Sequence, residues 1–227
     1  MPRREQANLC CGFCYLVAIS IAHKDAPAMM PATIIISKVK CCMNSHEKEL
    51  SKTISYALRH DPESYGLRLD KDGWVQITDL LQALRKRRRE WASLAQEDLA
   101  SMMANAKKQR FEMLDTRIRA LYGHSTAERI EKQPEQPPEL LYHGTAPETA
   151  ELILSDGLKS MARQYVHLSL EVATAREVGR RKHPKPVLLV VHAAEASKNG
   201  VAFYHGNESI WLADYVPAKF LSKIVDK

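Results

Sequence analysis

A proline-rich segment near the middle of the chain separates two stretches with different hydrophobic patterns. The segment reads KQPEQPP at residues 132–138, and its three prolines and lack of apolar periodicity predict an extended, fairly stiff spacer. Apolar residues before it recur mainly at helical spacing, whereas short β-rich runs dominate after it. We therefore expect one domain over residues 44–130, a linker over residues 131–138 and a second domain over residues 139–227.

The composition is that of an ordinary globular protein. Hydrophobic residues make up 45% and charged residues 26% of the 227 residues, which excludes collagen-like and largely disordered chains. The formal charge of +6 weakly favours a polyanionic partner such as nucleic acid or a nucleotide. The sequence contains no P-loop, G-x-G-x-x-G turn, H-E-x-x-H helix or G-x-S-x-G elbow, so the common nucleotide-binding, zinc-protease and hydrolase classes are disfavoured.

Residues 1–43 differ from the rest of the chain in their cysteines. All five lie there, namely Cys10, Cys11, Cys14, Cys41 and Cys42. A cysteine-free body suits a reducing compartment, and it offers no Cys and His pair that would complete a metal site. We therefore expect a cytoplasmic protein that binds no metal.

The same segment carries an uncharged run over residues 6–22 that resembles a secretory signal. Gly12 and the cysteines interrupt its apolar core, no A-x-A cleavage site follows, and it is shorter than the roughly 20 residues that span a membrane. Directly after Met43, Asn44 and Glu47 have the spacing of a capping box, which predicts a helix start. We expect no membrane association, and we expect residues 1–43 to be an extension that is poorly ordered or not translated.

The first half is predicted to hold three helices and two hairpins. The first helix ends at Asp61, because the residue before a proline avoids the helical region. Thr78 is expected to cap the second helix, and the third begins near Gln96. The hairpins are expected to pair residues 67–69 with 74–77 and residues 110–114 with 117–121. Three helices with a terminal hairpin suggest a winged helix.

The second half is predicted to mix strands and helices, so the expected fold class is α+β. Gly157 is expected to end the first helix of this half. The predicted strands cover residues 140–143, 165–168, 187–191, 201–204 and 210–212, and the predicted helices cover residues 148–155 and 171–180.

Four short stretches carry side chains suited to chemistry, and each also has a purely structural explanation. Arg59 and His60 end the first helix, where a solvated helix end with charges that compensate the helix dipole is by itself the better explanation. Arg110 closes a run of cations, Lys107 to Arg110, that could simply be an exposed surface. The turn His143-Gly144-Thr145 allows close approach of backbone to a ligand. Alternation predicts that Arg163, Tyr165, His167 and Ser169 share one strand face, although His167 could be a satisfied core histidine.

In this order, these stretches resemble the NAD-dependent RNA 2′-phosphotransferases, which remove a 2′-phosphate from the splice junction of tRNA. The resemblance covers residue 45 to the C-terminus and rests on the motifs LRHDP, GLRLDKDGW, KKQRF, GHS, LYHGT, DGL, YVHLS, ATAREVG and SIWL. It implies a winged-helix RNA-binding lobe followed by an ADP-ribosyltransferase-like lobe that binds NAD. It does not extend to residues 1–43.

The resemblance also implies roles for individual residues. The catalytic group would be Arg59, His60, Arg110 and Arg163, and the NAD site would include His143, Gly144, Thr145, His167, Ser169 and Ile210. NAD would serve as co-substrate without a metal, through an ADP-ribosylated 2′-phosphate intermediate, and the products would be 2′-hydroxyl RNA, ADP-ribose 1″,2″-cyclic phosphate and nicotinamide. The partner would be a tRNA-like RNA, and we expect a monomer.

Two alternatives remain open at this point. One is an ADP-ribosyltransferase that modifies a nucleic-acid phosphate and stops there. The other is a non-catalytic winged-helix regulator that senses NAD. The arginine cluster at residues 85–89 could add RNA contacts, but a solvated helix end is the better explanation.

Overall fold

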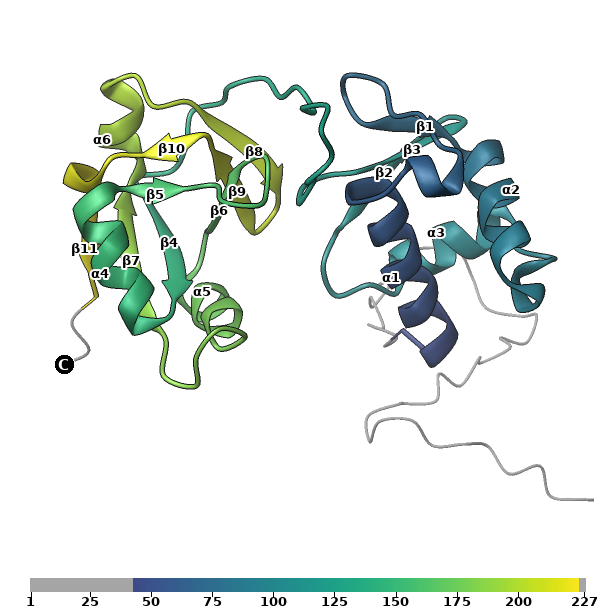
Figure 1. Cartoon of the computed structure of the whole chain (residues 1–227), viewed down its shortest axis with the longest axis horizontal. Helices are drawn as coiled ribbons and strands as arrows, with labels where there is room; N and C mark the ends of the chain where they lie inside the picture. Colours follow the sequence, from purple (N-terminus) through teal and green to yellow (C-terminus); the bar gives the residue numbers. More distant parts are fainter. Residues whose placement is uncertain (1–42, 225–227) are drawn as a thin grey trace, which may run out of the picture. The chain divides into compact units, whose positions relative to one another are not determined.

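The computed structural model describes residues 43–224 of the protein (Figure 1). The five cysteines and the uncharged run over residues 6–22 lie outside this range. So does the expected extension over residues 1–43, except for Met43.

Helix α1 (Ser45–Arg59) begins at the predicted capping box. The Asn44 side-chain oxygen accepts a hydrogen bond from the Glu47 N–H at 2.8 Å, and the Glu47 carboxylate accepts one from the Asn44 N–H at 2.8 Å. Glu47 is buried, and its second oxygen accepts a hydrogen bond from Asn105 at 2.7 Å. The same side chain therefore starts α1 and ties it to the end of α3 (Gln96–Ala104).

The second helix is present but starts earlier than predicted. Strand β1 (Trp74–Gln76) runs directly into α2 (Ile77–Arg87), so Thr78 lies inside the helix and does not cap it. The Ile77 N–H instead donates to the Thr116 carbonyl at 2.8 Å. A distant turn thus supplies the partner that a capping side chain would have supplied.

The strands of the first half form one three-stranded antiparallel sheet. Strands β2 (Phe111–Leu114) and β3 (Arg117–Ala120) form the predicted hairpin, and β1 pairs with β3 to give the order β1-β3-β2. The predicted hairpin between residues 67–69 and 74–77 is therefore wrong. Its turn does contain a glycine with positive φ, Gly73 at +83°, but the strand after the turn pairs elsewhere.

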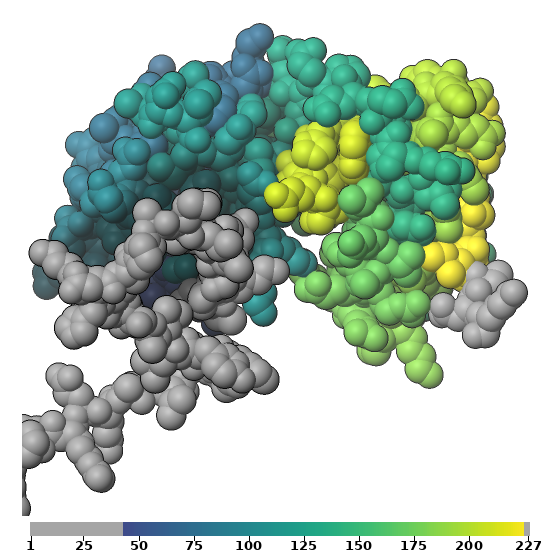
Figure 2. Space-filling model, turned by 180° about the vertical axis from the view of Figure 1, so that it is seen from behind, coloured from purple at the N-terminus to yellow at the C-terminus, as the bar shows by residue number. Residues whose placement is uncertain are grey.

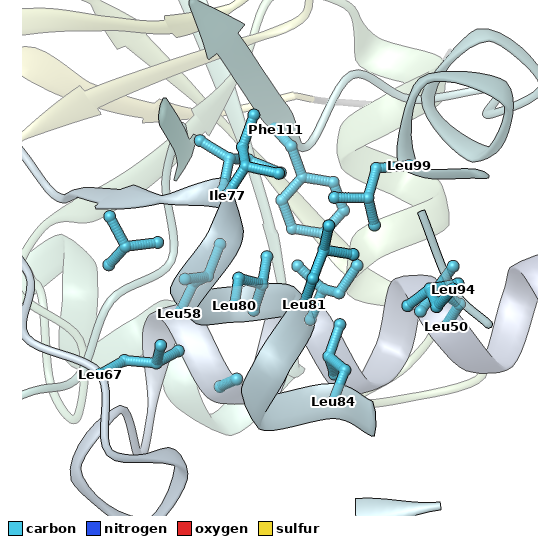
Figure 3. Close-up of a cluster of buried hydrophobic side chains, with 14 of the residues drawn as sticks. Leu50, Leu58, Leu67, Ile77, Leu80, Leu81, Leu84, Leu94, Leu99 and Phe111 are labelled. Carbon is cyan, nitrogen blue, oxygen red and sulfur yellow. The ribbon is translucent and has the colours of Figure 1, made fainter. Parts of the chain in front are cut away.

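Side chains from α1, α2, α3 and the sheet meet in a first hydrophobic core (Figure 3). Leu50, Ile54 and Leu58 of α1 are almost fully buried, as are Leu80 and Leu84 of α2. The spacing of three and four residues seen in the sequence thus corresponds to one buried face on each helix.

The second half forms a six-stranded antiparallel sheet with the order β11-β7-β4-β6-β9-β8 and a two-stranded sheet of β10 and β5. The predicted strands and helices are all present, with ends shifted by a few residues. The strands are β4 (Leu140–Thr145), β5 (Leu158–Lys159), β6 (Val166–Ser169), β7 (Val187–His192), β8 (Phe203–Asn207), β9 (Ile210–Ala213), β10 (Tyr215–Val216) and β11 (Leu221–Lys223). The helices are α4 (Pro147–Asp156), α5 (Val172–Gly179) and α6 (Ala193–Lys198). Short 3-10 turns cover Glu63–Tyr65, Arg89–Trp91 and Ala218–Phe220.

A second hydrophobic core lies on this sheet, with contributions from α4 and α6. Helix α5 approaches strand β4 so closely that a side chain at Gly144 would not fit. An added Cβ there would lie 2.1 Å from the Ala175 carbonyl oxygen and 3.1 Å from the Gly179 nitrogen. Gly144 is therefore needed for packing between helix and strand, not only for turn flexibility.

Residues 121–139, which lead into β4, form neither helix nor strand. They are hydrogen-bonded to both halves: the Glu131 N–H donates to Lys71 O, and the Glu135 N–H donates to Phe203 O, both at 2.8 Å. The described residues belong to one compact unit. On the face drawn in Figure 2, yellow atoms from late in the chain meet teal atoms from its middle, in keeping with a hydrogen bond from Asn207 Nδ2 to Gln109 O at 2.6 Å.

The α+β fold class is confirmed by this mixture of helices and antiparallel sheets. In the part of the chain that the structure describes, none of the helices has the length and apolar character needed to cross a membrane.

Candidate active site

The four residues predicted to form a catalytic group come from three separate places in the chain. Arg59 is the last residue of α1, and His60 caps its C-terminus. Arg110 directly precedes β2. Arg163 lies in a turn three residues before β6. The Arg59–His60 pair, Arg110 and Arg163 are far apart in the sequence, so only the tertiary fold could bring their side chains together.

Arg59 is held in a mostly buried position beside Tyr122. Its Nη2 donates a hydrogen bond to the Arg110 carbonyl at 3.2 Å, and its Cζ lies 4.9 Å from the centre of the Tyr122 ring. Its Nε is buried without a hydrogen-bond partner among the described residues. Burial lowers the pKa of Arg59 to about 10, which still leaves the guanidinium charged at neutral pH.

The remaining cations lie near enough to act on Arg59. Burial is the largest cause of the lowered pKa of Arg59. The positive charges of Arg110 and Arg163 lower this pKa further, whereas Tyr122 raises it. Within residues 43–224, no carboxylate lies within ion-pairing distance of any of these three arginines. The cluster is therefore positive and not neutralised by the described residues, which suits a dianionic group such as a phosphate.

His60 is oriented by a serine at its inner nitrogen. Its Nδ1 shares a hydrogen bond of 2.8 Å with Ser125 Oγ, and its ring lies 5.9 Å from that of Tyr56. Partial burial, and then the charges of Arg59 and Arg163, lower the pKa of His60. The ring is therefore neutral near pH 7, and its Nε2 is left for another partner.

Residues 123–125 hold the end of α1 in place. The Ser125 N–H donates to the Arg59 carbonyl at 2.8 Å, in addition to the contact between Ser125 and His60. Gly123 has a φ of +91°, and an added Cβ there would lie 3.5 Å from Arg59 Cδ. Sequence reasoning used the GHS motif only as a mark of resemblance and missed its contact with both predicted catalytic residues.

The predicted NAD-binding residues lie on three neighbouring strands of the large sheet. His143, Gly144 and Thr145 are on β4, His167 and Ser169 are on β6, and Ile210 begins β9. His143 Nδ1 donates a hydrogen bond to the His167 carbonyl at 3.0 Å. Ser169 is opposite both Tyr142 and Ile210 in the strand register. The fold thus places these residues in one region of the sheet.

His167 connects this group to the arginines. Its ring lies 5.9 Å from the Tyr122 ring in an edge-to-face arrangement, and Tyr122 in turn contacts Arg59. Burial, followed by the charge of Arg163, lowers the pKa of His167 to about 3, so the ring is neutral. Its Nε2 is buried without a protein partner in the described residues, as expected of an atom reserved for a ligand. Tyr122 was not singled out from the sequence.

The expected shared face of residues 163–169 is only partly correct. Strand β6 begins at Val166, so Arg163 and Tyr165 precede it. Tyr165 is buried, and its hydroxyl donates to Ile130 O at 2.7 Å, so it is part of the framework and not of a site wall. A turn that includes Met161, with a φ of +55°, lies just before these residues, and the chain enters the strand only at Val166.

The arginine cluster at residues 85–89 is largely used within the fold. Arg85 donates two hydrogen bonds to Leu94 O, Arg87 donates to Ser64 O at 2.8 Å, and Arg88 pairs with Glu49 and Glu90. The structural explanation of this cluster is therefore the better one.

Comparison with known proteins identifies relatives over most of the chain. Residues 45–215 match the family model described as RNA 2′-phosphotransferase, Tpt1 / KptA family. A protein of Acetivibrio thermocellus, named probable RNA 2′-phosphotransferase, is 49% identical over 173 residues, which are 76% of this chain and 94% of the relative. Proteins of the same name from Bacillus thuringiensis subsp. konkukian and Nostoc punctiforme are 48% and 38% identical, over 76% and 78% of this chain and 93% and 96% of their own lengths. The chain belongs to the RNA 2′-phosphotransferase family.

Proposed function

We propose that the protein is an NAD-dependent RNA 2′-phosphotransferase. It would transfer the 2′-phosphate of a tRNA-like RNA to NAD and yield 2′-hydroxyl RNA, ADP-ribose 1″,2″-cyclic phosphate and nicotinamide. We expect it to act as a cytoplasmic monomer with an N-terminal winged-helix lobe and an ADP-ribosyltransferase-like C-terminal lobe.

The observation that carries this proposal is the unneutralised group of Arg59, Arg110 and Arg163. A bidentate guanidinium fits the oxygens of a phosphate, and the absence of competing carboxylates among the described residues leaves that capacity free. His60 and His167, both with lowered pKa values, border the same group. A binding-only role in nucleic-acid recognition would not require a neutral histidine beside clustered arginines.

The residues near His167 fit a dinucleotide co-substrate. The His167 Nε2 is a buried polar atom that has no partner among residues 43–224. His143 donates from Nδ1, so its Nε2 can accept a hydrogen bond from a ribose hydroxyl or amide. We propose that His143, Gly144, Thr145, His167, Ser169 and Ile210 hold NAD, which supplies a ribose carbon, C1″, with nicotinamide as a ready leaving group.

In the first step, the RNA 2′-phosphate would be the nucleophile. A phosphate monoester already carries most of its second negative charge at pH 7, so no strong base is needed. A phosphate oxygen would form a bond to C1″ as the bond to nicotinamide breaks, giving an ADP-ribosylated 2′-phosphate. Arg59, Arg110 and Arg163 would orient the phosphate and balance its charge while the ribose develops positive charge.

In the second step, the ribose 2″-hydroxyl would attack the phosphorus and expel the RNA 2′-oxygen. One proton leaves the 2″-hydroxyl, and one must reach the departing 2′-oxygen. His60 is suited to hold or pass that proton, because its ring is neutral near pH 7 and Ser125 fixes its Nδ1. Ile210, an aliphatic residue on β9, provides no carboxylate of the kind that many other ADP-ribosyltransferases use to activate an acceptor.

The test is an assay with a 2′-phosphorylated oligonucleotide and NAD. We expect 2′-hydroxyl oligonucleotide and the cyclic phosphate in equal amounts. Accumulation of ADP-ribosylated RNA in place of these products would support the phosphate-modifying alternative. No turnover with intact NAD binding would support the regulator.

Single arginine variants locate the activity. Arg163→Ala should lower kcat by a factor on the order of 10² to 10³, as for loss of one transition-state donor. Arg163→Lys should recover only part of it, because an ammonium lacks the bidentate fork. Arg68→Ala is a matched control, since Arg68 is exposed and is not among the charges that act on Arg59; equal loss in both Ala variants would refute the assignment.

A further inference from the structure

A groove runs along α1 and ends at the candidate active site. Its volume is about 400 Å³, and it is lined by Met43, Lys48, Ser51, Lys52, Ser55, Tyr56, His60 and Arg110. A smaller hollow of about 180 Å³ shares Ser51 and Arg110 with it and continues toward Lys108 and Gln109. The candidate catalytic residues thus occupy only one end of a longer depression.

The charges in the groove are positive and available. Lys48 and Lys52 are exposed, and neither forms an ion pair with a described residue. The two nearby carboxylates of α1 are used elsewhere: Glu47 is buried against Asn44 and Asn105, and Glu49 pairs with Arg88. The described lining contains no acidic side chain. A polyanion can therefore enter without meeting a like charge.

Helical spacing orders these groups along one line. Lys48, Lys52, Tyr56 and His60 follow one another at intervals of four residues, so each is a neighbour of the next on the helix surface, and all four line the groove. At 1.5 Å per residue, the row is about 18 Å long. Two cations are followed by an aromatic ring and then by the histidine proposed to act on the 2′-phosphate.

Tyr56 has the features of a base-stacking platform. Half of its surface, 50%, is exposed, and its ring adjoins His60 at 5.9 Å. Proteins that bind single-stranded nucleic acid combine a basic groove along the backbone with aromatic rings on which bases stack. The α1 groove contains both elements.

We propose that the α1 groove binds the single-stranded RNA that flanks the 2′-phosphorylated nucleotide. Lys48 and Lys52 contact backbone phosphates, and Tyr56 stacks on a base next to the reacting nucleotide. This proposal rests on the proposed function, which places the 2′-phosphorylated nucleotide of the RNA beside His60 and Arg110. It adds a binding site for the neighbouring nucleotides, and it makes affinity depend on RNA length.

Binding can be tested without catalysis. Fluorescence anisotropy of a labelled single-stranded RNA with only 2′-hydroxyls, titrated with the full chain, gives Kd as a function of salt. For single strands, each lost phosphate contact reduces the slope of log K against log salt by about 0.7. We expect the double variant Lys48→Gln, Lys52→Gln to reduce it by about 1.4. The control pair Lys198→Gln and Lys219→Gln removes the same charge from exposed lysines elsewhere and should leave the slope unchanged.

Stacking is tested at Tyr56. Tyr56→Leu should weaken RNA binding by about 5- to 150-fold, the range for loss of one base-aromatic stack, whereas Tyr56→Phe should retain it. Displacement of the RNA by poly-glutamate at equal charge concentration would show that the groove is a general anion site and would overturn the proposal. So would a Tyr56→Leu variant that binds as tightly as Tyr56→Phe.

Turnover separates this proposal from the proposed function. With a 2′-phosphorylated dinucleotide, too short to reach the lysines, the double lysine variant should match the unmodified protein. With a longer 2′-phosphorylated RNA, its KM should rise while kcat is retained. If the unmodified protein turns over both substrates and the double lysine variant has the same KM for the longer one, the groove proposal is refuted and the proposed function stands. Lysine-dependent RNA binding without any turnover refutes the proposed function and leaves the groove standing.

Discussion

Replacing the buried His124 should make the protein less sensitive to mild acid. His124 is only 3% exposed, and its Nε2 has no hydrogen-bond partner among the described residues. Burial, followed by the charge of Arg59, lowers the pKa of His124 to about 3. In the unfolded chain the same imidazole titrates near 6.5, so acid protonates the unfolded state first.

The size of the effect follows from this difference. Because the folded pKa lies below the unfolded one, the contribution of His124 to stability is present above pH 6.5 and is lost as the pH falls toward 3. At pH 5 the pH is 1.5 units below 6.5, and at about 1.36 kcal/mol per unit the loss is about 2 kcal/mol. Any folded pKa below about 4 gives nearly the same value, since the folded state is then neutral at pH 5.

Urea unfolding at pH 7 and pH 5, at one ionic strength, measures the loss. Between these two pH values, His124→Gln should lose about 2 kcal/mol less free energy of unfolding than the unmodified protein. His46→Gln, at an exposed histidine in the first turn of α1, is the control and should behave like the unmodified protein. An equal acid loss in His124→Gln and unmodified protein would refute the reasoning.

Three further outcomes follow from contacts in the fold. Gly144→Ala should destabilise by about 3 kcal/mol or more, because its Cβ would overlap the Ala175 carbonyl; an unchanged thermal midpoint would contradict the packing of α5 on β4. Glu47→Ala should cost about 2 kcal/mol, against about 1 for Asn44→Ala, because only the first also removes the bond to Asn105; equal losses in urea unfolding would argue against that bond. Ser125→Ala should lower kcat about fivefold without changing the KM for NAD, and Ser125→Thr should restore it, since the hydroxyl holds His60 Nδ1; a change in KM alone would rule out positioning.

Local signals in the sequence were sufficient for most helices. The capping box at Asn44 and Glu47 involves residues three apart, so its bonds form within the segment that predicts them. The start of α2 could not be found this way, because Ile77 donates to Thr116, nearly forty residues later in the chain. The partner of β1 was mispredicted for the same reason: its pairing with β3 is not local.

In the candidate site, too, the sequence indicated the residues themselves but not the contacts that they make with distant parts of the chain. Residue types and resemblance indicated Arg59, His60, Arg110 and Arg163, and the structure brings their charges into mutual range. The partners of these side chains were beyond prediction, because Ser125 and Tyr122 acquire their roles only through contacts with residues far away in the chain. Arg163 was placed on a strand by alternation, but the turn at Met161 could not be recognised from an ordinary methionine.

The hydrogen bonds that join residues before the proline-rich segment to the later chain bear on how the protein can be divided. Gln164 donates to His124 O and Thr126 O, Tyr165 to Ile130 O, and Asn207 to Gln109 O, all at 3.0 Å or less. A polypeptide cut within the proline-rich segment would leave these donors without acceptors in the C-terminal fragment. Co-expressed fragments 1–138 and 139–227 should consequently reassociate, and neither is suited to serve as an autonomous module in a fusion protein.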